Sequence, residues 1–182
     1  KVDLEIIADG TISFDPIELT LRPGRNAVVR LADEERLEGL ESMSIVARSL
    51  DGVPVAVMNE SYLPFGDRPV SNLSATVGTS TMATSWLAPI EQDEGGLVIY
   101  NPSIGIVTAS VSEFIDGELV HVADVELGGG RRAILESSAF AGDRPLVLVD
   151  APSAVVVGRE LRGVSVHAQL LAVPAGGVEP LG

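Results

Sequence analysis

The chain has 182 residues, of which 46% are hydrophobic and only 4% aromatic, and its net charge is −14. This composition supports packed cores and excludes an intrinsically disordered chain, while the negative charge argues against binding to nucleic acids or anionic lipid surfaces. Cysteine is absent, which excludes disulfides, thiolate metal sites and a cysteine nucleophile.

Short strand-like runs separated by turn signals fill the first half of the chain. Asp9-Gly10 and Pro23-Gly24 mark turns, and Asp51-Gly52 is a hairpin signal. Only residues 32–43 look helical, and they are too few for more than a turn or two on a loop. We expect strands over residues 2–7, 12–14, 17–21, 26–31, 44–50, 53–62 and 71–78.

The second half has the same organisation. Its turn signals are Asn101-Pro102, Asp116-Gly117 and the glycines 128–130. Strand-like runs cover residues 95–100, 106–115, 119–127, 131–136, 145–150, 153–161 and 164–173. Short strands at this spacing, without strand–helix–strand alternation, predict an all-β protein built from antiparallel β-sandwiches.

Two matching stretches indicate an internal repeat. "LRPGRNAVV" at residues 21–29 and "LGGGRRAIL" at residues 127–135 both read Leu-x-x-Gly-Arg-x-Ala followed by two aliphatic residues. Asp9-Gly10 matches Asp116-Gly117, and residues 55–60 match residues 155–160, in the same order. Because the matches are turn residues and apolar alternation, we expect two copies of one sandwich, over residues 1–79 and 80–182.

The Gly-Arg pairs, Gly24-Arg25 and Gly130-Arg131, are predicted to be structural. Turns between strands often require a positive φ, which glycine adopts without steric cost. The alternative, in which each arginine clamps an anion, is the weaker interpretation in so acidic a chain. The tetrapeptide "GDRP" at residues 66–69 and 142–145 is out of step with the repeat and is interpreted as turn chemistry.

In their order, several of these segments resemble the actinobacterial DUF5719 family. Trp86 opens a module, a strand ends in Asn101-Pro102, Gly130-Arg131 forms the turn, and a late strand covers residues 155–160. The resemblance implies tandem immunoglobulin-like sandwiches, an extracytoplasmic location with an anchor outside this sequence, and a neighbourhood of envelope glycosyltransferase genes. The first copy lacks the Trp and Asn-Pro strands, so the chain either begins inside a module or completes that sandwich differently.

Catalytic and cofactor signatures are missing from the sequence. His121 and His167 are the only histidines, each in an alternating strand run, and no Gly-x-Ser-x-Gly elbow accompanies them. Two histidines without His-x-x-x-His spacing do not build a zinc site, and residues 91–96 do not match a calcium loop. We therefore expect no enzyme activity, no cofactor and no metal.

Trp86, the single tryptophan, has two interpretations. It fills the junction between the modules or the second core, or it is a stacking platform for a sugar. We predict a non-catalytic cell-envelope scaffold or partner-binding subunit, serving an envelope glycosyltransferase system through an envelope protein partner. The alternative is a carbohydrate-binding module acting on cell-wall glycan. Binding is expected at sheet edges or at loops near residues 31–43 and 61–71.

Overall fold

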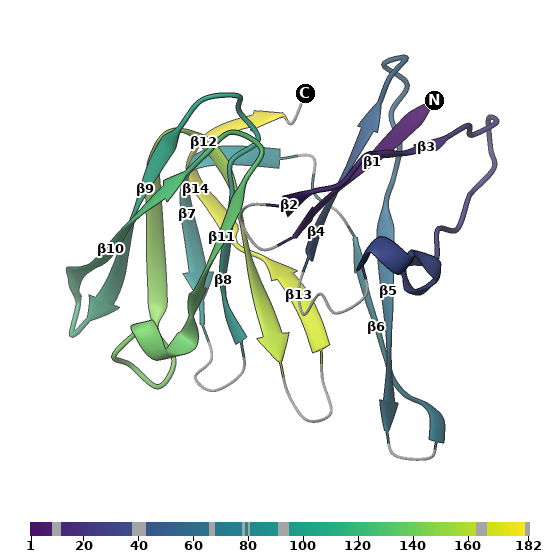
Figure 1. Cartoon of the computed structure of the whole chain (residues 1–182). Helices are drawn as coiled ribbons and strands as arrows, with labels where there is room; N and C mark the ends of the chain where they lie inside the picture. Colours follow the sequence, from purple (N-terminus) through teal and green to yellow (C-terminus); the bar gives the residue numbers. More distant parts are fainter. Residues whose placement is uncertain are drawn as a thin grey trace. The chain divides into compact units, whose positions relative to one another are not determined.

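The computed structural model describes residues 1–8, 12–37, 43–65, 68–77, 79, 81–90, 95–162 and 167–180. The chain divides into two compact units, residues 1–57 and 58–182 (Figure 1). The predicted all-β class is confirmed, because the described residues form strands without an α-helix, and the strand pairings among them are all antiparallel. Within the described ranges, helical structure is confined to short 3₁₀ turns at Leu31–Asp33, Glu35–Leu37 and Ser137–Ala139.

The first unit is a four-stranded sheet centred on β1 (Val2–Ala8). Along one edge, β4 (Met43–Ser49) pairs with the whole of β1. Along the other edge, β2 (Ile12–Ser13) and β3 (Ile17–Leu19) pair with successive halves of β1. Pro16 lies between β2 and β3, and proline has no backbone N–H to donate to a strand ladder there.

Two predicted features of the first unit are wrong. Residues 26–30 form no strand, although their sequence alternates in places. Asp51-Gly52 does turn the chain, with Gly52 at φ +73°, but it closes no hairpin. The reason is that β4 takes its partner from β1 at the start of the chain, and residues 53–57 pair with nothing described.

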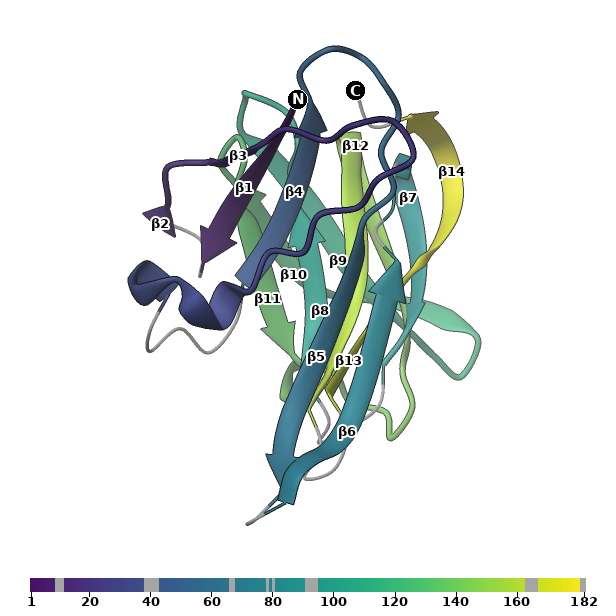
Figure 2. The same cartoon turned by 90° about the vertical axis from the view of Figure 1, so that its right-hand side faces the viewer.

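The second unit begins with a two-stranded ribbon, β5 (Met58–Phe65) and β6 (Arg68–Val77), which Figure 2 shows side by side. Sequence analysis expected a loop near residues 61–71 and placed this segment in the first repeat. The structure forms a hairpin there instead, and groups it with the second unit, in which β6 lies near β13 (His167–Leu171).

The rest of the second unit has two layers that share one strand. The five-stranded layer has the order β10-β9-β12-β7-β14, and the four-stranded layer has the order β11-β8-β12-β13. The strands are β7 (Thr81–Pro89), β8 (Gly95–Tyr100), β9 (Val107–Ile115), β10 (Glu118–Leu127), β11 (Arg132–Glu136), β12 (Leu146–Arg162) and β14 (Val173–Pro180). Residues 146–150 of β12 pair in the first layer and residues 156–162 in the second.

The core of the second unit lies between these layers. Aliphatic side chains alternate inward along each strand, as a half-buried pleated surface requires. Val107, Ala109 and Val111 enter from β9, while Leu97 and Ile99 enter from β8. Every member of this core cluster lies between residues 83 and 172, so the second unit has a core of its own.

The β9–β10 hairpin is predicted correctly. Asp116 and Gly117 form its two-residue loop, with φ values of +52° and +87° between the paired residues Ile115 and Glu118. Positive φ at both positions is the geometry of a type I′ turn, for which Asp-Gly is a preferred sequence. The hairpin holds β10 in register at the edge of the five-stranded layer.

Candidate functional site

The outer face of the five-stranded layer is the candidate site. Along β9 the odd-numbered residues from Val107 to Glu113 are buried, so Ser110, Ser112 and Phe114 point to the opposite side of the sheet. Directly paired residues on neighbouring strands share a face, which extends this outer surface across β10, β12, β7 and β14.

One end of this outer face carries an apolar patch. Leu119 of β10 pairs with Phe114 of β9, and Leu146 of β12 pairs with Pro89 of β7. The next row joins Leu148, Leu87 and Val173. The patch therefore consists of Leu87, Pro89, Phe114, Leu119, Leu146, Leu148 and Val173.

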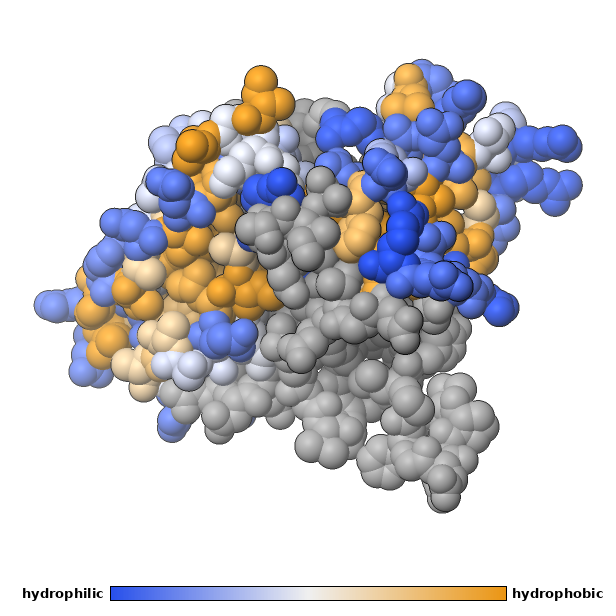
Figure 3. Space-filling view, in the orientation of Figure 1, coloured by the Kyte–Doolittle hydropathy of each residue, from blue (hydrophilic) through white to orange (hydrophobic). Residues whose placement is uncertain are grey.

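The apolar patch is open to solvent. Leu119 is 50% exposed, Leu146 41%, Phe114 37% and Val173 63%. Figure 3 shows hydrophobic side chains gathered among polar ones on the side of the molecule where β9 and β10 lie. Contiguous exposed apolar residues of this kind on a folded protein usually mark a contact surface.

The other end of the outer face is polar and acidic. Asp124 and Asp150 both pair with Ser110, and Glu126 pairs with Thr108. Among the described ladder residues of this face there is no lysine or arginine. The face therefore combines an apolar half with a negatively charged half.

His121 lies on this polar half between two potential partners. Its Nδ1 is 3.4 Å from Ser110 Oγ, and its Nε2 is 3.8 Å from Asp124 Oδ1. A β-bulge between His121 and Ala123 brings Asp124 to this position. Sequence analysis did not connect these three residues, because the bulge that aligns them has no local signature.

The Ser110–His121–Asp124 geometry is poor for nucleophilic catalysis. Both distances exceed those of a well-formed hydrogen bond, and the side chains of His121 and Asp124 are 56% and 65% exposed. An activated serine also needs donors aimed at the developing oxyanion, whereas backbone N–H groups of a central strand such as β9 are used by its ladders.

Glu113 is a buried carboxylate on the inner face of β9, 2% exposed. Its Oε2 and Oε1 accept hydrogen bonds from the backbone N–H groups of Ala141 and Gly142, each at 2.8 Å. Two such bonds give the buried carboxyl group polar partners in place of water. Glu113 thereby fixes the second "GDRP" segment in front of β12, and the sequence contained no signal for this long-range contact.

The two Gly-Arg pairs form the same local structure. Gly24 has φ +68° and Gly130 has φ +66°. The N–H of Arg25 donates to the carbonyl of Arg22, and that of Arg131 donates to the carbonyl of Gly128, both at 3.1 Å. A positive φ at the third residue of a four-residue turn is typical of type II geometry. One pair belongs to each unit, and each shapes a turn.

Trp86 lies within the core of the second unit. It sits in the middle of β7 and is 1% exposed. Its indole N–H donates to the carbonyl oxygens of Ala83 at 3.0 Å and Val155 at 2.9 Å. These bonds satisfy the one polar group of the ring at the point where the β7–β12 register shifts. The ring presents no face to a ligand in this position.

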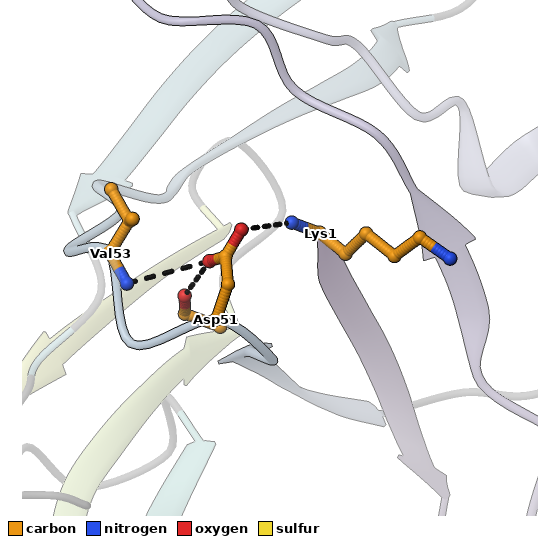
Figure 4. Close-up of polar contacts among 4 residues, drawn as sticks. Lys1, Asp51 and Val53 are labelled. Atoms are coloured by element: carbon orange, nitrogen blue, oxygen red, sulfur yellow. Dashed lines mark hydrogen bonds and ion pairs between the residues drawn. The ribbon is translucent and has the colours of Figure 1, made fainter.

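In the first unit, Asp51 holds the end of β4 against the start of β1 (Figure 4). Its carboxylate accepts hydrogen bonds from the Lys1 amino group at 2.8 Å and from Ser49 Oγ at 3.0 Å. In a chain that begins at Lys1, the α-amino group of Lys1, followed by the Ser49 hydroxyl and the Val53 N–H, lowers the pKa of Asp51 from 3.8 to about 2. These contacts lie at the end of the first sheet where β1 begins and β4 ends.

Other expected site residues give less information. The side chain of His167 lies outside the described residues, as does Asp9-Gly10. No cluster of three or more His, Asp or Glu side chains suited to a metal ion occurs in the described ranges. Over the same ranges, no helix has the length and apolar character needed to cross a membrane.

Comparison with protein-family models, with curated proteins and with solved structures finds no match for this chain.

Proposed function

We propose that this chain is a non-catalytic binding module that docks a protein partner through the apolar patch on the five-stranded layer. The single observation that carries the proposal is the row of exposed apolar side chains crossing neighbouring strands of that layer. A solvated sheet face is normally polar, and apolar residues on it weaken solubility. Binding by another protein removes this disadvantage.

The area of the apolar patch limits the binding free energy that it supplies. Half-exposed leucine, phenylalanine or valine side chains contribute roughly 1 kcal/mol each when a partner covers them. The four members Phe114, Leu119, Leu146 and Val173 therefore supply about 4 kcal/mol, which is well short of the ~8 kcal/mol of a micromolar complex. The acidic half of the face is the natural source of the remaining contacts, and it selects a partner with basic side chains there.

We further propose that this binding takes place in the cell envelope, outside the cytoplasm, in the service of an envelope glycosyltransferase system. Support for this placement comes from the ordered resemblance of Trp86, Asn101-Pro102 and Gly130-Arg131 to the DUF5719 family. Support for a protein partner over a glycan comes from the aromatic residues. Trp86 is buried, and Phe114 is the one exposed ring among the described side chains.

A photo-crosslinking experiment tests the proposed face. Phe114 is replaced by p-benzoylphenylalanine in the cells that produce the protein, and Val28, an exposed aliphatic residue on a loop of the first unit, is replaced as the control. We expect a discrete protein adduct from position 114 and none from position 28. The adduct at position 114 is expected to disappear with Leu119→Glu or Leu146→Glu.

Other outcomes contradict the proposal. The patch is not the binding face if position 114 gives no adduct, or if Leu119→Glu leaves the adduct unchanged. Binding of a cell-wall glycan that survives Leu119→Glu would favour the carbohydrate-binding alternative. Unchanged circular dichroism of each variant establishes that the exposed substitutions have not unfolded the sheet.

A further inference from the structure

β4 forms one edge of the first sheet, and its outer side has no strand partner among the described residues. Figure 2 shows it beside β1, which pairs with its inner side. β4 runs for seven residues, Met43–Ser49, without a proline, a glycine or a bulge. A long and regular edge is a template for pairing with another strand. The outer side of β4 is called the β4 edge from here on.

Several other edge strands in the described ranges carry features that discourage such pairing. β10 has a bulge between His121 and Ala123 and contains three acidic residues. β14 contains Pro174 and a bulge after it, while β2 and β3 are only two and three residues long. Natural sheets use these features to prevent edge-to-edge pairing. β4 has none of them, so its edge is available to a second strand.

The direction of the backbone groups decides which residues of β4 can pair outward. The N–H of Leu50 donates to the carbonyl of Lys1 at 3.0 Å, so the backbone groups of Leu50 point toward β1. Neighbouring residues of a strand point their N–H and C=O groups to opposite sides. The groups of residues 44, 46 and 48 therefore point toward β1, and those of residues 43, 45, 47 and 49 form the β4 edge.

The segment that follows β4 does not serve as the partner of this edge. A hairpin with Asp51-Gly52 as its two-residue loop would place Val53 opposite Leu50 and require these two residues to bond to each other. The Leu50 N–H is already used by Lys1. Pro54 would follow opposite Ser49, where it has no N–H to donate. The β4 edge is therefore left for a strand of another molecule.

We propose that this strand is β4 of a second copy of the chain, paired antiparallel about a two-fold axis at Val46. Ile45 then lies opposite Ala47 of the second copy, and Met43 lies opposite Ser49 of the second copy. These are the residues whose backbone groups point outward, so each such pair forms two ladder hydrogen bonds. An axis at Val46 pairs all seven residues of β4. Because both edges are used, the assembly stops at a dimer.

The apolar face of the sheet continues across the dimer in this register. On β1, Leu4 and Ile6 share a face, and they pair with Ala47 and Ile45 of β4. Ile45 opposite Ala47 of the second copy therefore joins two apolar rows into one. A shift by one residue would place apolar side chains beside the polar face. The alternation of β4 thus fits a copy of itself at this position.

Charge also favours a second copy in this register. Arg48 is the one charged residue of β4, and its guanidinium lies 3.9 Å from the carboxylate of Glu5 in the same chain. Arg48 lies opposite Ser44 of the second copy, so the paired strands bring no like charges together. The net charge of −14 repels two copies at long range. At about 0.15 M salt this repulsion is screened beyond roughly 8 Å, so association is measured there.

Disulfide crosslinking tests the register, because the chain contains no cysteine. Val46 and Val46 of the second copy form a pair without hydrogen bonds, whose Cα atoms are about 4.5 Å apart, a separation that suits a disulfide. Arg48 and Arg48 of the second copy are offset by four residues, about 13 Å along the strands. We expect Val46→Cys to form a covalent dimer under mild oxidation, and Arg48→Cys to form at least tenfold less.

The Arg48→Cys variant is a demanding control. Arg48 is more exposed than Val46, so random collisions favour its oxidation. Equal or greater crosslinking of Arg48→Cys would therefore overturn the proposed pairing.

Sedimentation equilibrium on the full chain tests the association itself. We expect the mass to rise with concentration from 19.0 kDa toward twice that value. Ala47→Pro removes an outward N–H and leaves the hydrogen bonds to β1 in place, so this variant is expected to need at least tenfold higher concentration to dimerise. Ala47→Ser keeps the N–H and is the matched control. Circular dichroism of both variants establishes that the sheet stays folded.

Two results would contradict the dimer. A chain that stays monomeric up to about 1 mM does not pair through β4. A dimer that survives Ala47→Pro but is lost in Leu119→Glu forms through the apolar patch instead. The β4 edge belongs to the first unit and the apolar patch to the second, so either proposal can fail without the other.

Discussion

Individual polar side chains determine the shape of the surface in both units. Asn101 and Glu113 are buried in the second unit and direct their polar atoms at backbone groups of distant loops. Breaking such an arrangement leaves buried donors or acceptors unsatisfied, at about 1–3 kcal/mol each. Trp86 is likewise a buried side chain with a polar partner far away in the sequence, since its indole N–H donates from β7 to the carbonyl of Val155 in β12. These residues connect loops and strands of the second unit through contacts that are distant in the sequence.

Asp51 provides a pH-dependent test at the scale of one residue. In a chain that begins at Lys1, its pKa is about 2 in the folded state, below its usual 3.8, mainly because the α-amino group of Lys1 donates to it. A lowered pKa stabilises the folded state fully above about 4, and this contribution is lost as the pH falls from about 4 to about 2. An NMR titration of the Asp51 carboxyl group is expected to show a midpoint near 2.

A chain extended by one glycine before Lys1 is the control for that titration. The extension replaces the amino group by an amide, which removes the positive charge beside Asp51. The midpoint is then expected to rise toward 3.8. A midpoint that is the same in both chains would show that the Lys1 amino group does not hold this carboxylate.

At the scale of elements, the loop before β11 approaches the loop between β8 and β9 closely at Gly129, and this contact gives a prediction about a glycine substitution. Gly129→Ala places a methyl group against the backbone of Ile104, which must move. We expect a loss of about 1–3 kcal/mol in the free energy of unfolding, as for other overpacked sites. Urea denaturation measures this loss, and NMR shifts of Ser103 and Gly105 report the displaced loop.

Gly105→Ala is the matched control on the same loop. No atom lies within 4 Å of the Cβ that it adds, and Gly105 does not have a positive φ. The free energy of unfolding is expected to stay the same or to rise by up to ~1 kcal/mol, since alanine restricts the unfolded chain. Equal losses in the two variants would contradict the close approach at Gly129.

On the scale of the whole molecule, the core of the second unit predicts that this unit folds alone. All members of its core cluster lie between residues 83 and 172. A fragment of residues 58–182 is therefore expected to unfold cooperatively in urea. Trp86, the only tryptophan, is expected to keep the blue-shifted emission of a buried indole. Emission already at the wavelength of the denatured fragment before urea is added would contradict independent folding.

The sequence predicted well wherever local chemistry decides the structure. Asp116-Gly117 gave the β9–β10 hairpin, and the Gly-Arg pairs gave positive-φ turns, because these backbone angles depend on residues that are adjacent in the chain. Period-two alternation gave the all-β class and the strands β8, β9, β10 and β11. It missed β7 and β14, and it predicted two strands where β12 is continuous. The same rules failed at residues 26–30, where the alternation is present but no neighbouring strand pairs with them.

The candidate sites depended on contacts that no local pattern contains. The apolar patch exists because β9, β10, β12, β7 and β14 align in one register, and the bulge after His121 moves Asp124 beside that histidine. Exposure of Ile104 and burial of Asn101 were likewise decided by packing between loops about 25 residues apart. The sequence by itself determined the tight turns and the all-β class, because turn angles and side-chain alternation depend on residues that are adjacent in the chain. The tertiary structure alone decided which side chains face water together, because burial depends on the whole fold.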